Sequence, residues 1–76
     1  MNTQQTVSDG YMMGIKEARE IKNELEADGI VLTSDVVHRL LQTEIELCAQ
    51  FRGSEVADLY RGSRDFWKLQ LKKLSN

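Results

Sequence analysis

The segment that most constrains the fold is residues 34–51, in which apolar residues recur at helical spacing. At about 100° per residue, these side chains cover an arc of roughly 180°, so we expect a helix that packs against neighbours on two sides. Glu44 falls near the middle of that arc. A carboxylate buried there without a partner costs several kcal/mol, so the sequence predicts that a polar or cationic group faces Glu44.

Capping residues and glycines mark the ends of two helices. Ser8 and Thr33 are residue types that cap helix N-termini, and we expect a helix to begin directly after each of them. Gly29 and Gly53 follow the two apolar patterns and are expected to end these helices near residues 27 and 51. Local signals therefore place the first two helices.

The third segment is expected to begin at Ser54 and to reach about Leu74. Gly62 and Ser63 interrupt its pattern and leave two alternatives open, a single helix or a break at Gly62. The predicted fold class is therefore all-α, a small domain of three helices, or of four if the last one breaks. The second helix is expected at the centre because its apolar arc is the widest.

Seventy-six residues are enough for one domain, which we expect to span 8–76 after a disordered tail at 1–7. A core of this size seldom gives more than about 3–5 kcal/mol unless a disulfide, a metal or a second subunit adds to it. Cys48 is the single cysteine, which excludes an internal disulfide, and no Cys/His cluster has zinc spacing. Oligomerisation, which we expect to give a homodimer, and binding to another protein are the remaining common routes to stability, and an efficiently packed monomer stays open.

The sequence also indicates a compartment. No apolar run approaches the roughly 18 residues that a membrane span needs, and the polar N-terminus does not read as a signal peptide. A lone free thiol suits a reducing compartment. We therefore expect a cytoplasmic protein with no membrane partner.

Charge is divided unevenly along the chain. Residues 1–51 carry a net charge of −5 and residues 52–76 a net charge of +3. Four cations of the last segment share one side of the predicted helix and form what we call the basic strip: Arg61, Arg64, Lys68 and Lys72. Such a strip can be a solvated face, pair with the acidic first helix, steer an acidic partner protein or neutralise phosphates.

Lys22 is the leading candidate for the partner of Glu44, as a buried polar pair. If the first two helices run antiparallel, the two residues lie at similar levels, and the lysine stem can span the remaining distance. Arg64 is a second candidate, and a hydrogen bond to Tyr60 or Trp67 or a polar contact across an interface with another chain are further alternatives. No further acid, base or metal ligand is visible near Glu44, so we expect no catalytic residue, no metal site, no cofactor and no enzymatic activity.

Apolar side chains off the packing faces point to a binding function. Met12, Met13 and Leu69 are expected to be exposed, and exposed methionines on so small a domain indicate a protein contact. We therefore expect a small non-enzymatic regulatory or adaptor protein that binds another protein, with these residues as anchors and the basic strip as the steering charge. Small proteins of this kind are frequent among the accessory proteins of phages and mobile elements.

The stretch SEVADLYRGSRDFWKL at 54–69 suggests an alternative. It resembles a helix-turn-helix DNA-binding unit, with a Glu-Val-Ala-Asp-Leu-like first helix, a glycine-containing turn and Ser-Arg opening the second helix. The resemblance implies a DNA-binding regulator whose recognition helix is 63–73. The residues that it assigns to the major groove and the phosphates are Ser63, Arg64, Asp65, Lys68, Lys72 and Lys73.

Overall fold

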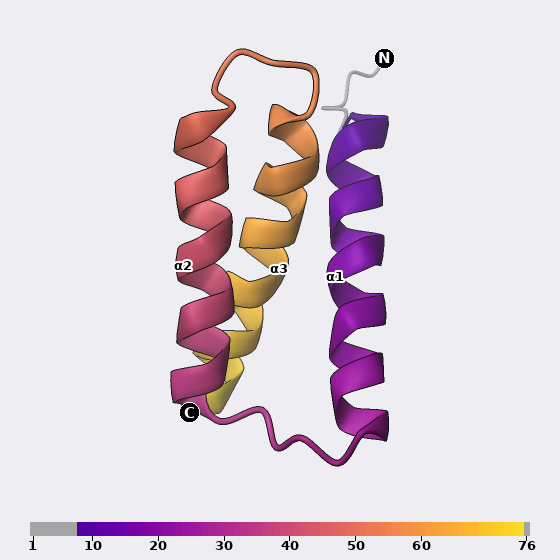
Figure 1. Cartoon of the computed structure of the whole chain (residues 1–76), viewed down its shortest axis with the longest axis vertical. Coiled ribbons are helices and arrows are strands. Elements are labelled where there is room, and N and C mark those ends of the chain that lie inside the picture. The colour runs from indigo at the N-terminus through magenta and orange to yellow at the C-terminus, as the bar shows by residue number, and fades with distance from the viewer. Residues whose placement is uncertain (1–7, 76) are drawn as a thin grey trace, which may run out of the picture.

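The computed structural model describes residues 8–75 and consists there of three helices and their connections (Figure 1). The helices are α1 (Asp9–Ala27), α2 (Ser34–Gln50) and α3 (Ala57–Leu74). The predicted all-α fold class with three helices is confirmed. The tail predicted to be disordered, residues 1–7, and the last residue, Asn76, lie outside the described residues.

The ends of α1 and α2 follow the local signals. The hydroxyls of Ser8 and Thr33 each accept a hydrogen bond from the backbone N–H three residues further on, at 3.1 and 3.3 Å. Gly29 and Gly53 have φ angles of 82° and 83°, in the left-handed region that glycine adopts without steric cost. These caps and turns therefore act as the sequence predicted.

The start of α3 differs from expectation, and its continuity decides between the two alternatives left open by the sequence. The predicted cap at Ser54 is wrong, because the helix begins at Ala57 after a run of turns and has no side-chain cap at Val56. α3 then continues through Gly62 to Leu74, so the alternative of a break at that glycine is also wrong. Gly62 lies instead against the backbone of Tyr11 in α1, where a Cβ atom would collide with the carbonyl oxygen. This glycine serves a close approach of two helices.

The central helix is α3, and the expectation that the second helix would be central is wrong. α1 and α2 each pack along α3, whereas between residues 8 and 75 no backbone contact joins α1 to α2. Figure 1 shows α1 running parallel to α3 and α2 running antiparallel to it. The wide apolar arc of α2 is only partly covered, since Val37 and Leu41 are buried but Ile45 stays exposed.

The core lies where α3 meets the other two helices. Its buried cluster consists of Ala18, Val37, Leu41, Phe66 and Trp67. Trp67 is 1% exposed, and its ring meets that of Phe66 edge to face, with centroids 5.1 Å apart. In the described part of the chain, none of the helices combines the length and the apolar content that crossing a membrane demands.

Candidate functional site

A hollow of about 430 Å³ lies between α2 and α3 and joins an apolar floor to a cationic edge. The floor belongs to α2 and the edge mainly to α3. The lining residues are Leu41, Ile45, Cys48 and Ala49, with Arg52, Arg61, Arg64 and Lys68. We call this feature the basic groove. Apolar surface beside an edge of cations suits a ligand that is itself apolar on one side and negatively charged at its edge.

Helical spacing and the antiparallel packing together assemble the edge. Arg61, Arg64 and Lys68 follow one another at steps of three and four residues, so they share a face of α3. Arg52 follows the end of α2, which the turn at Gly53 brings back beside the start of α3. Three members of the basic strip therefore line the groove, and the fourth, Lys72, does not line it.

Neighbouring carboxylates hold two of the groove arginines. Arg61 forms an ion pair with Asp58, one turn earlier on α3. The Nε atom of Arg64 donates to Oδ1 of Asp65 at 2.9 Å, and this bond leaves the two terminal amino groups of Arg64 outside the pair. The bond to Asp65 raises the pKa of Arg64 further, so its guanidinium is charged under all ordinary conditions.

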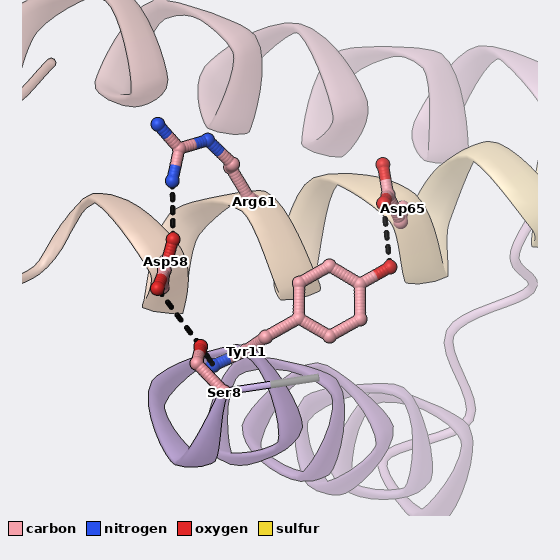
Figure 2. A network of polar contacts seen from close by, with 5 residues as sticks. All are labelled: Ser8, Tyr11, Asp58, Arg61 and Asp65. Carbon is pink, nitrogen blue, oxygen red and sulfur yellow. Dashed lines mark hydrogen bonds and ion pairs between the residues drawn. The ribbon is translucent and has the colours of Figure 1, made fainter. Parts of the chain in front are cut away.

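Both carboxylates also accept a hydrogen bond from α1 (Figure 2). The Ser8 hydroxyl donates to Asp58 at 2.8 Å, and the Tyr11 hydroxyl donates to Asp65 at 2.5 Å. Burial by itself raises the pKa of Asp65, but the bonds from Tyr11 and Arg64 outweigh it, and the net shift is downward. The same bond to Asp65 raises the pKa of Tyr11.

The predicted pair of Lys22 and Glu44 does not form. Lys22 binds Glu26 on its own helix at 3.1 Å, and α1 and α2 are not in backbone contact. Glu44 faces Ser63 of α3 instead. Burial raises the pKa of Glu44, the hydrogen bond with Ser63 opposes that rise, and the negative charge of Glu17 adds to it. The prediction of a polar partner is met by a hydroxyl, while the prediction of a cation is wrong.

The predicted apolar anchors lie away from the basic groove. Met12 and Met13 are about half exposed and line a shallow hollow on α1 with Ile15. Leu69 is also exposed and lines a separate hollow between α1 and α3. The structure thus brings together the cations that the sequence singled out, but it does not place the three apolar residues beside them.

The arrangement expected from the helix-turn-helix resemblance differs from the observed one. Residues 63–73 belong to the uninterrupted helix α3 and do not form a separate recognition helix after a turn. Ser63 is 7% exposed and faces α2, and Asp65 is bonded to Tyr11 and Arg64. Lys68, Lys72 and Lys73 are exposed.

Sequence reasoning missed the floor of the groove and the helix contact behind it. Ile45 and Ala49 lie at the edge of the apolar arc of α2, and a residue there that stays uncovered can line a binding surface. The missed signal for the α1 contact is the four-residue spacing of Gly10, Gly14 and Ala18, which marks one narrow face of α1.

Comparison of the chain with protein-family models, with curated proteins and with solved structures finds no match. Among residues 8–75, no three His, Cys, Asp or Glu side chains gather closely enough to hold a metal ion. The support for the basic groove as a binding site therefore comes from its lining residues and their contacts.

Proposed function

We propose that this chain is a non-enzymatic regulatory or adaptor protein that binds an acidic, amphipathic helical segment of a partner protein in the basic groove. The observation that supports this proposal is the lining of the groove. Four cations line the groove together with an apolar floor made of Leu41, Ile45, Cys48 and Ala49. An anion without an apolar side leaves that floor in water, and an apolar ligand without acids makes no ion pair with the cations.

The spacing of the apolar residues in the groove favours a helix as its occupant. Leu41, Ile45 and Ala49 are spaced by four residues, so they form a line along α2 that is about 12 Å long at 1.5 Å per residue. A helix that lies beside two antiparallel helices presents its own apolar residues at the same spacing. Its acidic residues then face the α3 side of the groove, where Arg61, Arg64 and Lys68 lie.

The apolar floor of the groove favours a protein ligand over a DNA duplex. The cations of the groove lie beside apolar side chains of α2. Duplex DNA offers phosphates but no apolar side chains for such a floor. DNA binding by the exposed lysines of α3 is the alternative outcome of the test below.

The test measures binding of synthetic ligands by fluorescence anisotropy. The probe is a helical peptide of about 20 residues with leucines on one face and glutamates along one edge, and the comparison ligands are the same peptide with lysines for glutamates and a short DNA duplex. We expect the acidic peptide to bind tightest. Lys68→Glu and Ile45→Asp should each weaken it about tenfold or more.

The matched control for charge is Arg39→Glu, since Arg39 is exposed on α2 and is not part of the groove. It should leave the affinity for the acidic peptide within about twofold of the wild type. Tighter binding of the duplex than of the peptide, or equal effects of Lys68→Glu and Arg39→Glu, would overturn the proposal.

A further inference from the structure

The carboxylate of Asp65 connects α1 to the basic groove. Its Oδ2 atom accepts the hydroxyl of Tyr11 at 2.5 Å, and its Oδ1 atom accepts the Nε–H of Arg64 at 2.9 Å. Tyr11 is not part of the groove, whereas Arg64 lines it. The carboxylate of Asp65 therefore joins the hydroxyl of Tyr11 on α1 to the guanidinium of Arg64, which lines the groove.

Asp58 repeats this arrangement two turns earlier on α3. Its Oδ2 atom accepts the hydroxyl of Ser8 at 2.8 Å, and its Oδ1 atom pairs with Nη1 of Arg61 (Figure 2). Ser8 is also the N-cap of α1, so the start of that helix and Arg61 share one carboxylate. In both carboxylates, one oxygen accepts a hydrogen bond from a hydroxyl of α1 or its N-cap, and the other pairs with an arginine of the groove.

Close packing of α1 on α3 makes both bonds reachable. Gly14 lies against the backbone of Leu59, and Gly62 lies against the backbone of Tyr11, so neither position has space for a side chain. At this separation short side chains such as serine and aspartate span the gap between the helices. The two arginines are partly exposed, at 44% for Arg61 and 33% for Arg64, and an exposed arginine without such support samples many rotamers.

We infer that Ser8 and Tyr11 are positioning residues for the basic groove, which orient Arg61 and Arg64 through Asp58 and Asp65. This inference rests on the proposed function. Holding an arginine in its binding geometry before the ligand arrives removes part of the entropy that binding otherwise loses. Affinity in the groove consequently depends on the docking of α1, although α1 supplies no residue to the groove lining.

The first test needs no ligand. In Tyr11→Phe the ring remains and only the hydroxyl that binds Asp65 is lost, and nuclear magnetic resonance can follow the Nε–H of Arg64 directly. We expect this group to be ordered and slow to exchange with water in the wild type, and mobile and faster to exchange in the variant. The control is Tyr60→Phe, which changes a tyrosine whose ring packs on Phe51. Unchanged order at Arg64 in Tyr11→Phe would overturn the inference whether or not any peptide binds.

The second test is a double-mutant cycle on the acidic peptide. Tyr11→Phe should weaken the affinity about fivefold in the wild-type background and by less than about twofold in the Arg64→Ala background, because Tyr11 then has no arginine to orient. A purely structural role predicts equal losses in both backgrounds and would overturn the inference. Failure of the wild type to bind the peptide would count against the proposed function, and the resonance test would still decide the positioning role.

Discussion

The half-buried carboxylate of Glu44 lies beside a hydroxyl and near a second negative charge. Ser63 offers one hydrogen bond, which does not compensate for the burial, and the pKa of Glu44 is raised. The native state therefore binds this proton more tightly than the unfolded chain does. As pH rises from the unfolded pKa through the higher native pKa, Glu44 progressively lowers the stability of the fold.

Replacement of Glu44 by glutamine tests whether its buried charge lowers the stability of the fold. We expect Glu44→Gln to be more stable than the wild type near pH 7, because the amide carries no charge to bury. The advantage should shrink towards about pH 4, where the wild-type carboxyl is protonated. Urea unfolding followed by circular dichroism at both pH values measures it. A stability advantage that is equal at both pH values, or larger in acid, would contradict a raised pKa of Glu44 in the native state.

The pKa of Asp65 on α3 is shifted in the opposite direction to that of Glu44 on α2. Hydrogen bonds from Tyr11 and Arg64 more than compensate for its burial, so its native pKa lies below its ordinary value. The stability that it contributes is present at neutral pH and is lost as pH falls through the native pKa. We expect Asp65→Asn to destabilise the fold at neutral pH and to have little effect in strong acid, by the same unfolding measurement.

Among the elements, the parallel pairing of α1 with α3 depends on glycine. A Cβ atom at Gly14 would collide with the carbonyl group of Leu59, whereas one at Gly10 would lie 3.3 Å from the Cβ atom of Asp58. In an open helix, replacing glycine by alanine stabilises by about 1 kcal/mol. Where the backbones of α1 and α3 touch, as at Gly14, we expect the same replacement to destabilise the protein.

We expect Gly14→Ala to destabilise the protein by about 2 kcal/mol or more, because the two helices have to move apart. Gly10→Ala is the matched control and should be much milder, since only a small shift is needed at that position. The free energy of unfolding from chemical denaturation compares the two variants. Equal stability of the variants would mean that the close contact contributes nothing.

The whole molecule has a small core and much uncovered apolar surface. Within the described residues, six apolar side chains are buried, while nine large ones are exposed. Domains of this size commonly gain stability from a second subunit. We propose that the chain forms a homodimer in which a second copy covers Met12 and Met13, which are exposed on α1 away from the groove.

Light scattering on the purified chain tests this homodimer proposal. We expect a mass of twice 8.7 kDa at micromolar concentration, and a shift towards 8.7 kDa in the double variant Met12→Asp, Met13→Asp. The variant has to keep its helical circular dichroism for the comparison to hold. A wild-type mass of 8.7 kDa across that range would remove the homodimer.

The sequence by itself determined the all-α fold class, the ends of α1 and α2 and the face shared by the cations of α3. These features depend on residues a few positions apart, such as Thr33 before α2 or Arg61, Arg64 and Lys68 on one helix face, and neighbours in the chain set caps and helical periodicity directly.

Only the tertiary structure decided which helix is central, what faces Glu44 and whether α3 continues through Gly62. The width of an apolar arc does not say which neighbour covers it, and α2 leaves Ile45 uncovered. A glycine in a sequence can indicate either a turn or a close contact between helices. For Gly62 the backbone of Tyr11, which lies against it, shows that the second applies. Each of these outcomes depends on atoms that are far apart along the chain, where local periodicity carries no information.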